Sequence, residues 1–178
     1  MKLEVKNLEK KFKNFTAVKN INFHIDNGQT LGVLGPNGCG KTTTIGMLLG
    51  LIKPSNGKIL IDDENFENLN REKILSQFNF ASPYVELPKK LTVKENLEIY
   101  GRLYGVKDLT RKIHEVSDDL NLSIFLNKKT GELSSGQKNR LSLAKSLINN
   151  PKILFLDEPT ASLDPDIGDF VRNYIEDY

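Results

Sequence analysis

Nine consecutive residues, 35–43, have the types and spacing of a loop that wraps the phosphates of a nucleotide. They satisfy the pattern G-x-x-x-x-G-K-[ST]. Glycines let backbone N–H groups turn inward around an anion, the lysine reaches the outer phosphates, and the hydroxyl after it can hold magnesium. The sequence therefore predicts a nucleotide site formed by Gly35, Pro36, Asn37, Gly38, Cys39, Gly40, Lys41, Thr42 and Thr43.

Two adjacent carboxylates, Asp157 and Glu158, follow an apolar run at 153–156. Such a run predicts a buried strand, and ligands bind at the carboxyl ends of strands in open α/β sheets. Unpaired carboxylates at the end of a buried strand are costly, which favours a functional interpretation over a structural one. We expect Asp157 to hold magnesium, in most such sites through water, and Glu158 to orient or deprotonate an attacking water.

Two further features are ambiguous when taken alone. Residues 133–137, Leu-Ser-Ser-Gly-Gln, precede an amphipathic helix expected to reach about residue 149. Small residues at a helix start can bind an anion through free N–H groups, but serine is also an ordinary helix cap. Phe12 lies in a lysine-rich connection, where its ring could stack on an adenine or pack in the core.

Several elements must position these residues. The apolar run at 30–34 predicts a buried strand before the phosphate loop, and residues 42–51 predict a helix after it. Alternating apolar residues near the start of the chain predict strands that form a small antiparallel sheet. The expected strands of this kind include 17–25; a strand at 58–61, a short helical stretch at 70–75 and a strand at 78–81 follow.

The middle of the chain, from 83 to 150, reads as an inserted helical subdomain. Thr92, with Glu95 three residues on, predicts a capping box at the start of one helix, and 110–120 predicts a second helix. His114 falls on the charged face of that second helix and is interpreted as a solvated residue.

Composition narrows the class of protein. A length of 178 residues fits one domain, and a formal net charge of +2 argues against a nucleic-acid partner. The single cysteine, Cys39, excludes an internal disulfide and fits a reducing compartment; we interpret it as a small residue of the loop. No apolar run approaches the ~20 residues of a membrane helix, and the N-terminus lacks the apolar core of a signal peptide. We expect a cytoplasmic chain that reaches a membrane by docking to a partner.

The order and spacing of these motifs resemble the nucleotide-binding domain of an ABC transporter. Residues 35–42 resemble its Walker A loop, 133–137 its signature motif and 153–158 its Walker B strand, while 161–164 resemble its D-loop. Phe12 stands where the family places an adenine-stacking aromatic, which favours stacking. The resemblance implies an α/β fold, a P-loop NTPase with a RecA-like core, a small N-terminal antiparallel β-sheet and an inserted α-helical subdomain.

In a single domain of 178 residues, we expect the antiparallel sheet and loop core at 1–82, the helical subdomain at 83–150, and the Walker B strand with its following helix at 151–178. The resemblance implies that two such domains close head to tail across ATP and magnesium. Lys41 would neutralise the outer phosphates, Thr42 and Asp157 would hold magnesium, and Glu158 would act in catalysis. Further nucleotide contacts, some made across the dimer, would come from Ser134, Ser135, Gly136, Gln137 and Asp164.

Closure of the dimer would drive a separate membrane-spanning partner, docked near residues 92–120 on the cytoplasmic face of the cell membrane. The overall look of the chain favours export. A binding-only module without turnover is the first alternative, and a soluble ATPase of the same type acting on ribosomes or DNA is the second.

Three departures from the family pattern bear on these expectations. Ser135 replaces the first glycine of the signature. Ser82 and Pro83 stand where a glutamine that contacts magnesium and water is expected. The family's switch histidine has no counterpart, since His24 and His114 lie elsewhere, and we expect the chain to be truncated at its C-terminus.

Overall fold

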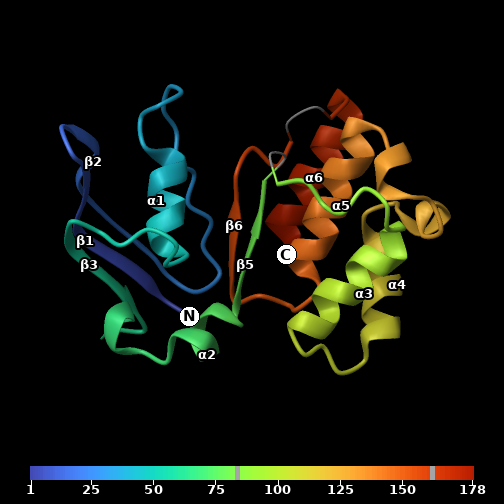
Figure 1. Cartoon of the computed structure of the whole chain (residues 1–178), viewed down its shortest axis with the longest axis horizontal. Helices are drawn as coiled ribbons and strands as arrows, with labels where there is room; N and C mark the ends of the chain where they lie inside the picture. Colours follow the sequence, from blue (N-terminus) through green and yellow to red (C-terminus); the bar gives the residue numbers. More distant parts are fainter. Residues whose placement is uncertain (83–84, 161–162) are drawn as a thin grey trace. The chain divides into compact units, whose positions relative to one another are not determined.

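The computed structural model describes residues 1–82, 85–160 and 163–178. These residues divide into two compact units, Met1–Leu75 and Ser76–Tyr178, and each is considered by itself (Figure 1). The finer division of the chain at residues 82 and 150 stays a prediction.

The first unit is built on a four-stranded antiparallel sheet with the order β2-β1-β3-β4. Strand β1 (Leu3–Phe12) forms a hairpin with β2 (Phe15–Ile25), in which Phe12 pairs with Phe15, and its other edge pairs with β3 (Asn56–Ile61). The short β4 (Glu64–Asn65) completes the sheet. The expected antiparallel sheet is confirmed. Its buried side chains on β1, β2 and β3 are Leu3, Val5, Leu8, Val18, Ile59 and Ile61.

Helix α1 (Lys41–Leu48) follows the phosphate loop, and its buried Met47 and Leu48 complete the core of this unit. A 3₁₀ turn, η1 (Phe66–Asn68), and helix α2 (Arg71–Leu75) end the unit. The strand expected at 30–34 is wrong: those residues are described and none of them is in a strand, while Leu34 is exposed. An apolar run predicts burial, but a strand also needs a hydrogen-bonded neighbour, and none of the strand pairings among the described residues includes this run.

The second unit contains a parallel pair of strands, β5 (Phe78–Ala81) and β6 (Ile153–Leu156). Both strands were expected from short apolar runs. Their register pairs Ala81 with Leu156, so the segments that follow β5 and β6 leave the sheet at the same edge. The residues that follow, Ser82 and Asp157, therefore emerge side by side.

Four helices make up most of the second unit: α3 (Val93–Leu103), α4 (Leu109–Asp119), α5 (Ser135–Leu147) and α6 (Pro165–Asp177). Two 3₁₀ turns, η2 (Ser123–Phe125) and η3 (Thr130–Glu132), lie between α4 and α5. Their apolar faces meet in one core, as amphipathic spacing predicts. Fully buried members of that core include Val93, Leu97, Val116, Leu120, Leu141, Ala144 and Ile148.

The last turn of α5 is joined to β5 by a partly buried lysine, Lys145. The ammonium of Lys145 donates to the carbonyl of Phe80 at 3.0 Å and to Oδ1 of Asn79 at 3.2 Å, and it lies 5.3 Å from the ring centroid of Tyr100 on α3. Burial lowers the pKa of Lys145. Because these partners are neutral and come from two other elements, the lysine fixes α5 against the strand that leads to Ser82.

The predicted capping box at the start of α3 is confirmed. Thr92 Oγ1 accepts a hydrogen bond of 3.1 Å from the Glu95 N–H, and Glu95 Oε2 accepts one of 2.7 Å from the Thr92 N–H. The hydrogen bonds from Thr92 lower the pKa of Glu95. Two helix N–H groups that would otherwise lack partners are thereby satisfied.

We expect Thr92→Ala to reduce the free energy of unfolding by about 1 kcal/mol, because the cap at α3 is lost. The change is measured from urea unfolding curves. Thr110→Ala is the matched control, since Thr110 is exposed on α4 and Asp108 caps that helix. An equal loss of unfolding free energy in both variants would show that the cap at Thr92 does not stabilise the protein more than an exposed helix threonine does.

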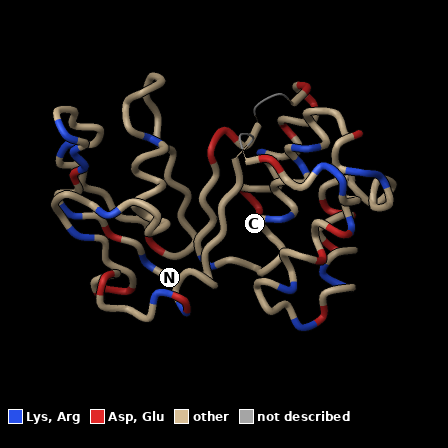
Figure 2. Tube along the Cα trace, viewed as in Figure 1, with Lys and Arg blue, Asp and Glu red and all other residues tan. Residues whose placement is uncertain are grey.

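Basic residues, lysine and arginine, and acidic residues, aspartate and glutamate, are distributed along the described residues of both units (Figure 2). No helix among the described residues combines the length and the apolar character that crossing a bilayer requires.

Candidate functional site

The phosphate loop lies in the first unit, between β2 and α1. Residues 35–39 are exposed, and the loop ends at Gly40, which is the N-cap of α1 with φ of 97°. Gly38 also has a left-handed φ, 82°, which glycine adopts without strain. A Cβ on Gly40 would lie 2.3 Å from the carbonyl oxygen of Ala17, so the loop is packed directly on β2 and only glycine fits there.

The ammonium of Lys41 is held inside this loop. It donates hydrogen bonds of 2.6 Å to the carbonyl of Gly35 and 3.0 Å to that of Pro36. Lys41 is also the first residue of α1, where Thr42 and Thr43 follow in the first turn. The loop therefore brings together a positive charge, the N-terminus of a helix and a backbone whose turns need glycine. This combination of groups is suited to binding phosphate.

Phe12 lies at the end of β1, in the same unit as the loop. The residue is 45% exposed, so it is not part of the core, which was the alternative to stacking. The hairpin carrying it lies beside the loop, because the loop's Gly40 packs on Ala17 and Val18 of β2, and Val18 pairs with Lys10 of β1. An exposed aromatic ring near a phosphate site is suited to stacking on a nucleobase.

The acid pair lies in the second unit, directly after β6. The Asp157 N–H donates a hydrogen bond of 2.9 Å to the carbonyl of Ala81, extending the parallel pairing by one residue. Glu158 is exposed and has φ of 49°, a left-handed conformation that is uncommon for glutamate. Asn139 of α5 donates to the carbonyl of Pro159 at 3.1 Å, which holds the backbone just after the pair.

Ser82, which stands where the resemblance expects a glutamine, contacts the first acid. Its hydroxyl donates a hydrogen bond of 3.4 Å to Asp157 Oδ2, long and therefore weak. Its own carbonyl accepts from the Ser142 hydroxyl of α5, also at 3.4 Å. A short hydroxyl side chain thus reaches the carboxylate predicted to hold magnesium. Pro83 lies outside the described residues.

The signature stretch forms the N-terminus of α5. Ser134 is the N-cap: its Oγ accepts from the Gln137 N–H at 3.2 Å, and Gln137 Oε1 accepts from the Ser134 N–H at 3.0 Å. This is a second capping box, so the capping interpretation of Ser134 is correct as a description of the structure. Ser135 and Gly136 occupy the first turn of the helix. The contact with a partner's phosphate stays a prediction.

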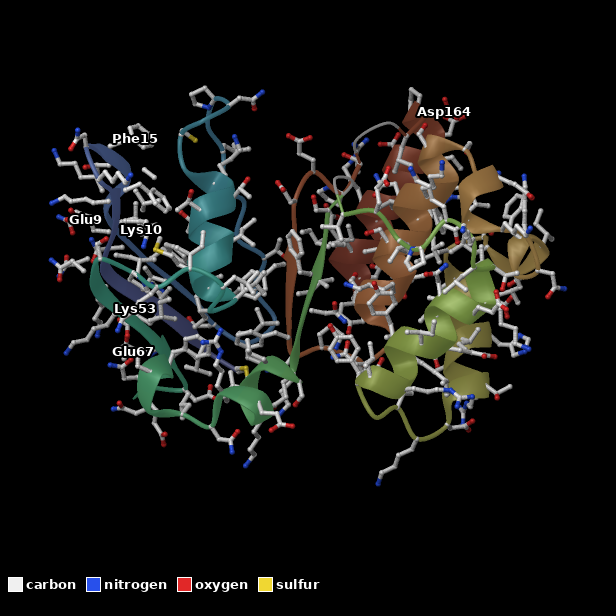
Figure 3. The ribbon with its side chains drawn as sticks, viewed as in Figure 1. Glu9, Lys10, Phe15, Lys53, Glu67 and Asp164 are labelled. Atoms are coloured by element: carbon white, nitrogen blue, oxygen red, sulfur yellow. The ribbon has the colours of Figure 1, made fainter. Side chains whose placement is uncertain are left out.

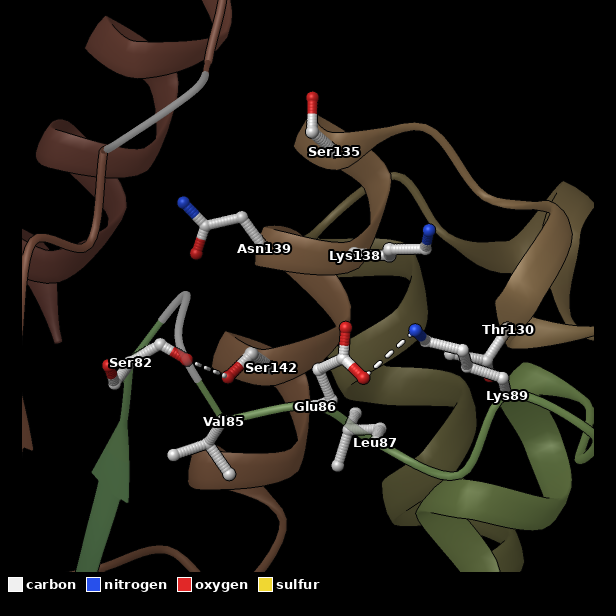
Figure 4. Close-up of a pocket in the computed structure, with 10 residues that line it drawn as sticks. All are labelled: Ser82, Val85, Glu86, Leu87, Lys89, Thr130, Ser135, Lys138, Asn139 and Ser142. Carbon is white, nitrogen blue, oxygen red and sulfur yellow. Dashed lines mark hydrogen bonds and ion pairs between the residues drawn. The ribbon is translucent and has the colours of Figure 1, made fainter.

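A cavity of about 150 Å³ lies behind the start of α5 (Figure 4). An ion pair between Glu86 and Lys89, 2.9 Å long, borders one side, and Ser142 with the Ser82 carbonyl borders another. The residues that line it are Ser82, Val85, Glu86, Leu87, Lys89, Thr130, Ser135, Lys138, Asn139 and Ser142.

The other predicted residues are placed as follows. Asp164 is the N-cap of α6, in an extended conformation (Figure 3). Ala161 and Ser162 of the expected D-loop lie outside the described residues. His114 is exposed on α4, as expected, and His24 lies on β2. Within the described part of the chain, no three His, Cys, Asp or Glu side chains are grouped as a metal site.

Sequence reasoning missed three residues beside the site: Lys10 next to Phe12, and Asn139 and Ser142 on α5. A signal existed for Lys10, because side chains two apart on a strand share a face. The two α5 residues join segments distant in sequence, and nothing local in the sequence indicates such contacts.

Comparisons with known proteins agree with this geometry. The family model described as ABC transporter matches residues 18–161. The Nod factor export ATP-binding protein I of Rhizobium sp. (strain N33) is 39% identical over 170 residues, covering 92% of this chain and 54% of that protein. The "Probable multidrug ABC transporter ATP-binding protein YbhF" of Escherichia coli (strain K12) is 38% identical over 165 residues, covering 92% of this chain and 28% of that protein.

A solved structure of the ATP-binding cassette MJ0796, a dimer in a post-hydrolysis state bound to ADP and Pi, is 29% identical, with a TM-score of 0.88; the match covers 97% of this chain and 81% of that one. This confirms the fold class expected from the sequence. The chain spans about half, or less, of the length of the curated relatives named above. On the extent of these matches, the chain belongs to the ABC transporter family and carries the ATP-binding cassette of that family.

Proposed function

We propose that this chain binds and hydrolyses ATP to power export by a separate membrane-spanning partner. The observation that supports this most directly is the phosphate loop, where the Lys41 ammonium is held by the carbonyls of Gly35 and Pro36 at the N-terminus of α1. The acid pair after β6 supplies groups for hydrolysis. The names of two relatives, which refer to multidrug transport and Nod factor export, favour export.

The proposed chemistry assigns one task to each group. The loop N–H groups and Lys41 bind the β- and γ-phosphates and stabilise the charge that develops during transfer. Glu158 accepts a hydrogen bond from the attacking water and orients it, or takes its proton. Phe12 stacks on the adenine. Ser134 and Gly136, with the other predicted residues of the signature, contact the γ-phosphate held by the partner chain.

The donors present suit magnesium. Thr42 and Asp157 offer one hydroxyl and one carboxylate, which are hard oxygen ligands, and we propose that each contributes one contact, in the case of Asp157 through water. The described residues contain no cluster of three acidic or imidazole ligands, which fits a cation that keeps several waters and binds phosphate oxygens. When bound, magnesium would neutralise phosphate charge.

Two partners belong to the proposal. A second copy of the cassette would close head to tail across ATP, which the dimeric state of the MJ0796 cassette supports. A membrane-spanning subunit would dock near residues 92–120, placing the chain on the cytoplasmic face of the membrane. This region includes α3, where Ile99 and Leu103 are exposed apolar side chains.

The test is ATP binding and steady-state hydrolysis measured on one sample of this chain over a range of protein concentrations. We expect saturable binding, and turnover per chain that rises with protein concentration because two chains must close on each nucleotide. Binding without turnover at any concentration would favour the binding-only alternative. Absence of ATP binding would overturn the proposal.

A further inference from the structure

A lysine two residues before Phe12 holds the ring of that phenylalanine. The ammonium nitrogen of Lys10 lies 4.9 Å from the ring centroid, within the range in which a cation is attracted to an aromatic face. The same ammonium donates a hydrogen bond of 2.7 Å to the carbonyl of Lys53, in the segment between α1 and β3. Two interactions therefore fix the cation over the ring.

The backbone around Lys10 is braced by the same segment. The Ser55 N–H donates to the carbonyl of Glu9 at 2.8 Å, and Ser55 Oγ accepts from the Lys11 N–H at 3.0 Å. Figure 3 marks Glu9, Lys10 and Lys53 on this side of the first unit. One short segment, 53–55, therefore contacts the backbone on both sides of Lys10 and also accepts a hydrogen bond from its ammonium.

We propose that Lys10 is a positioning residue for the nucleotide base: it holds one face of the Phe12 ring and so presents the other face for stacking on adenine. The inference rests on the proposed function and deepens it, because it assigns part of the base affinity to a residue that does not touch the nucleotide. Phe12 as a residue is 45% exposed, which leaves room for a base to approach its ring. The contact of Gly40 with Ala17 and Val18, the strand partner of Lys10, places this hairpin beside the phosphate loop.

The expected effect of Lys10 on base binding comes from the ordering of the Phe12 ring. A ring that is already fixed loses less rotamer freedom when a base stacks on it, so removal of the cation weakens base binding and leaves phosphate binding unchanged. We expect Lys10→Met to raise the Kd for ATP about threefold, the size set by one exposed cation–π contact. We expect the Kd for inorganic tripolyphosphate, which has no base, to stay the same.

The experiment is calorimetric titration of the whole chain with ATP and, separately, with tripolyphosphate, both in the presence of magnesium. Lys11→Met is the matched control, because it removes the same charge from the same strand while the Lys11 ammonium pairs with Glu9 at 2.5 Å. Lys10→Arg keeps a cation over the ring and should restore wild-type ATP affinity. In a Phe12→Leu background, Lys10→Met should have no further effect.

An ATP-specific loss in Lys10→Met that disappears in the Phe12→Leu background would support the inference. An equal loss for tripolyphosphate, or the same loss in Lys11→Met, would overturn it, because Lys10 would then act through charge on the phosphates. Unchanged ATP affinity in Lys10→Met would also overturn it. A wild-type chain that binds neither ATP nor tripolyphosphate would instead refute the proposed function itself, and this inference with it.

Discussion

Glu158→Gln is expected to retain ATP binding and to lose at least about 100-fold in steady-state turnover, since general-base groups typically contribute ~10²–10⁴-fold. Glutamine keeps the size and the hydrogen-bonding oxygen of glutamate but cannot accept the proton of the attacking water. Glu158 follows Asp157 at the end of β6, and the substitution leaves the backbone hydrogen bonds of that strand in place. Binding therefore separates from chemistry in this variant.

The measurement is ATP hydrolysis at saturating ATP beside a binding titration of the same preparation. Glu72→Gln is the control, because Glu72 is exposed on α2 and its substitution removes the same negative charge. Turnover near the wild-type rate in Glu158→Gln would show that another group prepares the water. Loss of ATP binding would show that the side chain holds nucleotide or structure instead.

Lys41→Ala is the second large effect. We expect the Kd for ATP to rise about 10- to 100-fold, because a hydrogen bond to a charged group contributes roughly 1.5–3 kcal/mol. In the structure the Lys41 ammonium donates to the carbonyls of Gly35 and Pro36. The loop itself therefore holds the positive charge of Lys41 in place. The loss should fall on tripolyphosphate as well as on ATP.

Equilibrium titration with both compounds checks this expectation. Lys19→Ala provides the comparison, since Lys19 is an exposed lysine of β2 in the same unit. If Lys41→Ala bound ATP with unchanged affinity, the lysine would not be a phosphate ligand. If Lys19→Ala lost as much affinity, the effect of Lys41 would be one of general charge.

Local signals accounted for much of the fold. The capping box at Thr92, the helix after the phosphate loop and the strands of the parallel pair are each set by neighbours in sequence, and each is confirmed. The sequence indicates a helix cap at Ser134, and serine followed three residues later by glutamine is itself a capping-box pattern, so the contact with Gln137 also has a local signal.

The partner of each strand, and the contacts between segments distant in sequence, could not be predicted from local patterns. The run at 30–34 has the apolar character of a strand, yet strand structure depends on a neighbour that the run does not encode. The position of β1 between β2 and β3 likewise depends on segments about 50 residues apart. At the site, the contact of Ser82 with Asp157 follows from the register of β5 and β6, which no motif indicates.

The capping box at Ser134 bears on how one hydroxyl can serve two partners. A serine hydroxyl has two acceptor lone pairs and one donor proton. The cap uses a lone pair, because Ser134 Oγ accepts from the Gln137 N–H. A phosphate oxygen would need the proton, which the cap leaves in place. Helix capping therefore uses a lone pair of the Ser134 hydroxyl and anion binding would use its proton. The two roles that the sequence leaves open for this residue are compatible with each other.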